Sequence, residues 1–218
     1  YLSGDTGTQA GGWFKNELTG LADVQGIRFR TPGLGGQVWA KLGATVTNLA
    51  AGEIFAALQS GTLDAAEFVG PYNDLALGFY QVAKNYYFPS FVEPGLATEL
   101  VVSKSKLEEL PPDLKELVEI CAQASYDDVS SDMYANDPRA LHALVNEHGV
   151  KVHQFPEEII EAGAKASVEL ITEIRESGDA LTKEVAESFV SALSLLRERT
   201  EGTDMPFLAA REKYVRFD

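Results

Sequence analysis

The first hundred residues combine short apolar runs with glycine-rich turns, in a pattern that predicts an α/β unit. Some runs alternate apolar and polar positions like strands, and others repeat apolar residues every three or four positions like helices. The predicted elements are strands at residues 26–31, 44–49 and 63–69 and helices at 36–42 and 51–60. Strands and helices in such short succession are typical of α/β folds with a parallel or mixed sheet. Residues 1–4 could form a strand edge.

The second part of the chain is mainly helical. The predicted elements are helices at residues 75–82, 111–133, 137–148, 156–177 and 181–200, a short helix capped by Ser105, and strands at 99–102 and 150–155. Asp137-Pro138 is typical of a helix start, since proline is tolerated in the first turn. Leu193 and Leu196 form an apolar stripe in the last helix, which suits core packing, with a dimer interface as the alternative.

Composition and charge narrow the possible functions. Hydrophobic residues make up 45% of the 218 positions, as in ordinary globular proteins. The formal net charge of −15 argues against a nucleic-acid partner, because nucleic-acid binding begins with lysine and arginine neutralising phosphates. No apolar run is long enough to span a membrane, and no signal peptide is visible. The single cysteine, Cys121, lies among apolar helix residues, where we expect it buried as a small hydrophobe.

Candidate chemistry gathers at strand-to-loop junctions, where open α/β sheets place their ligands. Residues 4–14 are rich in glycine but lack the spacing of nucleotide-binding loops. Gln9 and the aromatic pair Trp13-Phe14 suit the wall of a small-molecule site, although a plain tight turn is equally compatible. Arg30 ends a predicted strand, where its planar guanidinium can bind a carboxylate through two hydrogen bonds. The alternative for Arg30 is a surface salt bridge.

Two acidic residues lie in apolar surroundings. Glu67 stands in a largely apolar strand, where an unpaired carboxylate is costly and therefore needs a cation or a proton. Glu93 follows a run of aromatic residues. With an amide oxygen such as that of Gln9, the two acids could form an oxygen cage for a hard cation. They could equally form the acid–base pair of a glycosidase.

At these segments the sequence resembles the solute-binding proteins of tripartite ATP-independent periplasmic (TRAP) transporters, the DctP-like family. The resembling stretches are residues 7–14, 26–30, 56–72 and 87–95, in the family's order, and the third is quite specific. The resemblance is strongest to the branch that binds 2-oxo acids and lactate together with a metal ion. It implies an α/β periplasmic binding protein-like fold (type II) with two lobes, hinge-crossing strands and long C-terminal helices.

The resemblance also implies roles for particular residues. Arg30 would clamp the carboxylate of the ligand, and Tyr72 and Asn73 are further candidate contacts. Gln9, Glu67, the backbone carbonyl of Phe68 and Glu93 would hold a Na⁺ or Ca²⁺ ion that also touches the ligand. Many members of the branch have tryptophan at the position of Phe68, and a backbone ligand would survive that change.

These expectations describe a non-enzymatic periplasmic protein that captures a small monocarboxylate and delivers it to the membrane permease of a TRAP transporter. Residues 1–66 would begin one α/β lobe, residues 67–98 would cross the hinge and return, and residues 99–218 would complete the lobe and add the C-terminal helices. The N-terminal lobe is expected to be largely missing from this chain. The alternatives are a carboxylate-pair hydrolase and a scaffold that dimerises through its C-terminal helices; a homodimer is also possible for the binding protein.

Overall fold

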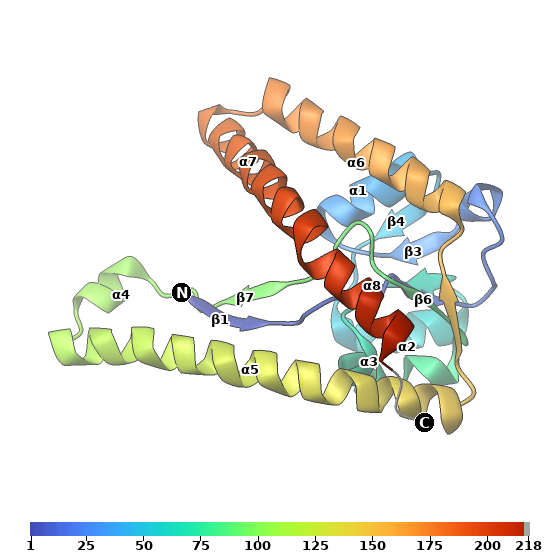
Figure 1. Cartoon of the computed structure of the whole chain (residues 1–218), viewed down its shortest axis with the longest axis horizontal. Coiled ribbons are helices and arrows are strands. Elements are labelled where there is room, and N and C mark those ends of the chain that lie inside the picture. Colours follow the sequence, from blue (N-terminus) through green and yellow to red (C-terminus); the bar gives the residue numbers. More distant parts are fainter. Residues whose placement is uncertain (216–218) are drawn as a thin grey trace. The chain divides into compact units, whose positions relative to one another are not determined.

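A mixed sheet of six strands is the framework of the first of two units in the chain (Figure 1). The units are Tyr1–Ser167 and Val168–Asp218, and the computed structural model describes residues 1–215. The strands lie in the order β4 (Thr45–Thr47), β3 (Arg28–Arg30), β5 (Ala65–Ala66), β2 (Gly12–Phe14), β6 (Asn85–Phe88) and β8 (Lys151–Gln154). β3 is parallel to β4 and β5, and β6 to β8, whereas β2 is antiparallel to β5 and β6. The predicted mixed α/β sheet is confirmed.

Successive side chains of β2 point to opposite faces of the sheet and start two separate cores. Trp13 is fully buried in a cluster with Ile54 and Leu58 of α2 (Ala51–Ser60) and Leu144 of α5 (Pro112–Asn146). The ring of Phe14 contacts aromatic side chains of the other core, namely Phe29, Trp39, Tyr87 and Phe155. Both faces are therefore filled with apolar side chains, which leaves the strand ends for polar chemistry.

Shorter elements and a second sheet complete the first unit. They are η1 (Leu21–Val24), α1 (Gly33–Lys41), α3 (Pro71–Leu77), η2 (Phe79–Gln81), α4 (Lys104–Glu108) and the strands β1 (Leu2–Asp5) and β7 (Ala97–Glu99). β1 and β7 pair antiparallel beside α5, as Figure 1 shows, and Ser125 of α5 donates a hydrogen bond of 3.0 Å to the carbonyl of Ser3. α6 (Glu157–Ser177) begins in this unit and ends in the second.

α5 is one helix of 35 residues, so the prediction of two helices on either side of residue 137 is wrong. Asp137-Pro138 lies inside the helix instead of starting a new one. The carboxylate of Asp137 accepts a hydrogen bond of 2.9 Å from the backbone N–H of Tyr72, which belongs to the first turn of α3. Asp137 thus caps a neighbouring helix, a role that no local pattern reveals.

The second unit contains the end of α6 and the helices α7 (Ala180–Gly202) and α8 (Asp204–Tyr214). Arg175 of α6 pairs with Glu187 of α7 at 2.8 Å. Leu193 and Leu196 are 54% and 58% exposed, so the prediction that this stripe packs in a core is wrong. Within residues 1–215, no helix combines the length and apolar character needed to cross a membrane.

Cys121 is also exposed, contrary to the prediction of a buried position. Its neighbour Ala122 is the buried residue of this turn of α5. The apolar residues around Cys121 in the sequence therefore do not mark a fully buried helix, and Ile120 is 54% exposed.

Candidate functional site

Arg30 is the last residue of β3, and its side chain is buried rather than forming the alternative surface salt bridge. Nε donates a hydrogen bond of 3.1 Å to the carbonyl of Leu49, and Nη1 donates one of 2.5 Å to the carbonyl of Glu67. A guanidinium has five N–H donors. Nη2 has no hydrogen-bond acceptor among the described residues. Arg30 therefore presents unused donors at a strand end.

Glu67 directly follows β5 and is 3% exposed. Its Oε2 lies 3.8 Å from Nη1 of Arg30 but has no hydrogen-bond partner among the described residues. Burial, and secondarily the nearby charge of Glu93, raises the pKa of Glu67 to about 8, although Arg30 opposes the shift. Nη1 of Arg30 and Oε2 of Glu67 are within ion-pair distance. They share no hydrogen bond, because the guanidinium donates to main-chain oxygens. Without a further cation, burial therefore favours the protonated form of the Glu67 carboxyl.

Gln9 lies in the loop between β1 and β2 and is 2% exposed. Its Nε2 donates a hydrogen bond of 3.1 Å to Oγ1 of Thr6, which fixes the orientation of the amide. The other amide atom, Oε1, is buried and has no partner among residues 1–215. The backbone of Gln9 bonds to Pro94 and Ser90, on either side of Glu93. The fold thus joins two segments that are far apart in the sequence.

Glu93 and Phe68 adjoin the same arginine. Glu93 is half-buried, and burial raises the pKa of its carboxyl while Arg30 lowers it. Both Glu93 and Glu67 act electrostatically on Arg30. The ring of Phe68 lies with its centroid 5.7 Å from Cζ of Arg30 and packs edge-on against Phe79. The structure therefore groups Arg30, Glu67, Phe68 and Glu93.

Tyr72 and Asn73 lie in the first turn of α3, beside this group in the sequence. Tyr72 is 38% exposed, and its backbone N–H is held by Asp137. Oδ1 of Asn73 is buried without a partner among the described residues. Among the described residues, neither Tyr72 nor Asn73 is hydrogen-bonded to Arg30, and their roles as ligand contacts stay predictions.

The donor types present fit a hard cation. The buried, unpaired oxygens Gln9 Oε1 and Glu67 Oε2 are amide and carboxylate atoms, as Na⁺ and Ca²⁺ require. No group of three or more His, Cys, Asp or Glu side chains within residues 1–215 could hold a metal. A cation here would therefore depend on amide and main-chain oxygens as well as on the two acids.

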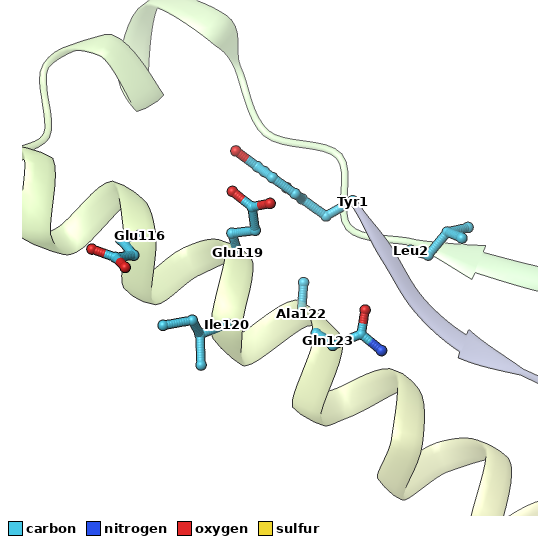
Figure 2. Close-up of a pocket in the computed structure, with 7 residues that line it drawn as sticks. All are labelled: Tyr1, Leu2, Glu116, Glu119, Ile120, Ala122 and Gln123. Carbon is cyan, nitrogen blue, oxygen red and sulfur yellow. The ribbon is translucent and has the colours of Figure 1, made fainter.

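Two cavities among the described residues lie apart from this group. One of about 600 Å³ lies between the start of β1 and α5, lined by Tyr1, Leu2, Glu116, Glu119, Ile120, Ala122 and Gln123 (Figure 2). Figure 2 shows the carboxylates of Glu116 and Glu119 on the α5 side of this cavity. The lining has two acids and no basic residue, so it does not suit an organic anion. A second cavity, of about 330 Å³, is lined by Glu17, Asp23 and Asp64 among others and also contains none of the candidate residues.

Sequence reasoning missed several residues that support the group. Thr6 holds the amide of Gln9, Asp137 holds the turn after Phe68, and Asp74 is a buried carboxylate of α3 bonded to Trp13 and Tyr86. Asp74 could have been noticed as an acid directly before the apolar residues 75–77. Thr6 and Asp137 give no such signal, because their partners are set by the tertiary structure.

Comparison with known proteins adds independent findings. The sequence model of the DctP family, described as bacterial extracellular solute-binding protein, family 7, matches residues 2–177. The chain is 37% identical over 189 residues to the monocarboxylate 2-oxoacid-binding periplasmic protein of Nostoc sp. (strain PCC 7120). This match covers 87% of the chain and 51% of the Nostoc protein.

Two solved structures are closely similar. The TRAP periplasmic solute-binding protein from Pseudoalteromonas atlantica T6c, with bound sodium and pyruvate, has a TM-score of 0.91 and 32% identity, over 96% of this chain and 64% of that one. The corresponding protein from Colwellia psychrerythraea, with bound calcium and pyruvate, has a TM-score of 0.89 and 34% identity, over 96% and 63%. The chain thus spans about half to two thirds of the length of these relatives. The predicted periplasmic binding protein-like fold is confirmed.

Proposed function

Because the chain belongs to family 7 of the bacterial extracellular solute-binding proteins, we propose that it binds a small monocarboxylate with the help of a Na⁺ or Ca²⁺ ion. The ligand class is a 2-oxo or 2-hydroxy acid. The similarity to the Nostoc 2-oxoacid-binding protein and to two pyruvate-bound structures supports this class. The observation that carries the proposal is a buried arginine with unused donors beside the buried, unpaired carboxylate oxygen of Glu67, in a fold that also buries the unpaired amide oxygen of Gln9.

The donor pattern of Arg30 indicates how the carboxylate binds. Nε is committed to the carbonyl of Leu49, and one N–H of Nη1 to the carbonyl of Glu67. The remaining N–H groups belong to Nη1 and Nη2, which form the end of the fork. A carboxylate can accept one hydrogen bond from each of these atoms, in the bidentate arrangement that makes arginine–carboxylate pairs strong.

A bound cation would offset the repulsion between the two acidic residues of the site. Glu67 and Glu93 repel each other, and both are partly or wholly removed from water. When bound, the cation supplies a positive charge for these acids and for the carboxylate and 2-oxygen of the ligand. Gln9 Oε1, Glu67, Glu93 and the backbone carbonyl of Phe68 would hold it. Tyr72 and Asn73 remain candidates for contacts with the rest of the ligand.

A thermal unfolding experiment tests the function. Purified chain is heated with pyruvate, 2-oxobutyrate or lactate, each in calcium buffer, in sodium buffer and in buffer with neither ion. A ligand that binds only the folded state raises the melting temperature with its concentration. We expect an increase with at least one acid, dependent on one of the ions. The absence of any shift with all three acids in all buffers would contradict the proposal.

The family match favours binding over the carboxylate-pair hydrolase, since the relatives are solute-binding proteins and not enzymes. The acids also have a role in cation binding that needs no reaction. The hydrolase would instead turn over a glycoside and lose that activity in Glu67→Gln. We propose that the chain has no catalytic activity.

We infer the location and the partners of the chain from its family. The relatives are periplasmic or extracellular, and we propose that this chain acts in the periplasm and delivers its ligand to the membrane permease of a TRAP transporter. We retain as a proposal the division into residues 1–66, 67–98 and 99–218. The last three residues of the third part lie outside the described residues.

We also propose a homodimer, on the basis of exposed apolar residues on α7. Apolar residues follow one another at intervals of about one turn on α7, and all are more than half exposed: Leu181, Val185, Phe189, Leu193 and Leu196. An exposed apolar stripe of this kind is typical of a helix that packs against a partner. The predicted dimer through the C-terminal helices would bury this stripe.

A further inference from the structure

Asp74 is a fully buried carboxylate that the proposed site does not use directly. It lies in the first turn of α3 and is 0% exposed. Oδ2 accepts hydrogen bonds of 2.8 Å from Nε1 of Trp13 and 2.7 Å from the hydroxyl of Tyr86. Oδ1 accepts a longer one, of 3.4 Å, from the backbone N–H of Val69. Three separate segments of the chain therefore meet at one side chain.

Each of these segments carries a candidate cation ligand. Trp13 belongs to β2, which follows the loop of Gln9, and Val69 directly follows Glu67 and Phe68. Tyr86 belongs to β6, which precedes the loop of Glu93. The carbonyl of Val69 also accepts a hydrogen bond of 2.9 Å from the N–H of Ala10. The chain segments that hold the four proposed ligands are thus tied together around Asp74.

A carboxylate suits this position better than other side chains of its size. It offers acceptors to all three donors, whereas an amide would place its own N–H groups against one of them. The Trp13 and Tyr86 rings stack at 3.9 Å, so their two donors reach the same oxygen side by side. Burial raises the pKa of Asp74 to about 6, and the hydrogen bonds from Tyr86 and Trp13 limit the shift.

We propose that Asp74 is a positioning residue for the cation site, which sets the spacing of the Gln9, Glu67–Phe68 and Glu93 segments before the ion binds. The inference rests on the cation-dependent function proposed above. Groups that orient metal ligands without touching the metal commonly change metal affinity by about tenfold to a hundredfold. A purely structural carboxylate would change stability and leave the affinity of the folded protein for the ion unaltered.

The test measures ion affinity and stability separately in the same variants. Calorimetric titration with CaCl₂, and with NaCl against choline chloride, gives the affinity of the chain for each ion, and urea unfolding gives its stability. Asp74→Asn puts an N–H group among the three donors, and Tyr86→Phe removes one donor while keeping the carboxylate and the ring stack. We expect about a tenfold to hundredfold weaker ion binding in Asp74→Asn and a smaller loss in the same direction in Tyr86→Phe.

Leu144→Ala is the matched control. Leu144 is fully buried in the same hydrophobic cluster as Trp13 and Tyr86, and its side chain has no polar group that could bond to the segments of the proposed ligands. This variant should be less stable and bind the ion as the wild type does. If Asp74→Asn and Tyr86→Phe lose stability in the same way and also keep wild-type ion affinity, the positioning role is excluded. If the wild type binds neither ion, the proposed function itself is wrong. This outcome is distinct from a failure of the positioning role, which is judged only from variants of a wild type that does bind an ion.

Discussion

Nη1 of Arg30 lies 3.8 Å from Oε2 of Glu67, yet the arginine gives its hydrogen bonds to main-chain carbonyls instead. The guanidinium is therefore held in place without being neutralised by the acid next to it. We expect Arg30→Met to abolish binding of pyruvate, and Arg30→Lys to weaken it more than tenfold, because an ammonium cannot reproduce the planar fork. Calorimetric titration with pyruvate in the ion-containing buffer measures the loss.

Arg28 provides the control for this prediction. It lies on the same strand, is exposed, and pairs with Asp64 at the surface. Arg28→Met removes the same charge from the protein and should leave pyruvate affinity within about twofold, since an exposed pair contributes little. Equal losses in the two variants would mean that net charge, and not the Arg30 fork, governs binding.

The buried carboxyl of Glu67 should make stability depend on pH in ion-free buffer. Burial and Glu93 raise its pKa from 4.5 to about 8, so between these values the folded chain holds a proton that the unfolded chain has released. The free energy of unfolding should then fall as the pH rises through this range, by up to about 1.4 kcal/mol per pH unit. Urea unfolding at several pH values measures the slope.

Glu67→Gln should remove this part of the slope, because the amide does not titrate. Added Ca²⁺ should stabilise the wild type increasingly as the pH rises over the same range, since the ion requires the ionised carboxylate. A slope that is the same in wild type and variant would show that Glu67 keeps an ordinary pKa.

Gly12 should tolerate no side chain. Its φ is +126°, and an added Cβ would lie 2.9 Å from the carbonyl oxygen of Ala66. We expect Gly12→Ala to destabilise the fold by about 1–3 kcal/mol, as for other residues forced into a disfavoured backbone region. Gly52 of α2 has open space around its Cβ, so Gly52→Ala should stabilise by about 0.5 kcal/mol. Urea midpoints compare the two, and equal effects would contradict the steric argument.

The apolar stripe of α7 predicts self-association. Phe189→Asp, which puts a charge at a position 52% exposed in the single chain, should convert a dimer to a monomer without changing the fold. Light scattering after size-exclusion chromatography reports the mass of each form. Ser191→Asp is a control on the same helix, at an exposed polar position. A wild type that is monomeric at all concentrations would remove the basis for this interface.

The elements that follow local rules were predictable from the sequence. α2 has the predicted bounds, because its apolar spacing and the following Gly61 define both its length and its end. α3 begins at Pro71 and not at residue 75, because its first turn is capped by Asp137 from a distant helix. β2 and β6 were not predicted, since Gly12 and the aromatic run 86–88 become strands only through their pairing with each other and with β5 and β8. α8 was missed as well.

In the candidate site, too, some residues could be identified from the local sequence and others depend on tertiary contacts. Arg30 and Glu67 stand out in the sequence because a charge at the end of a strand or inside an apolar run is unusual. The structure groups them with Phe68 and Glu93, and the ligand roles of all four residues stay predictions. Asp74 and Thr6 act through contacts with residues up to 90 positions away, such as the bond from the N–H of Leu96 to Thr6. No spacing in the sequence could have indicated those partners.

The uninterrupted course of α5 has a mechanical consequence. Pro138 has no N–H to give to the carbonyl four residues earlier, so the helix is least stiff at this point. At the preceding position, the carboxylate of Asp137 accepts a hydrogen bond from the N–H of Tyr72, a few residues after Glu67 and Phe68. Because of this bond, we expect bending of α5 at Pro138 to displace the turn at 70–72 as well. The β1–β7 sheet is bonded to α5 on the N-terminal side of Pro138, through Ser125. We expect this sheet to move with that part of the helix.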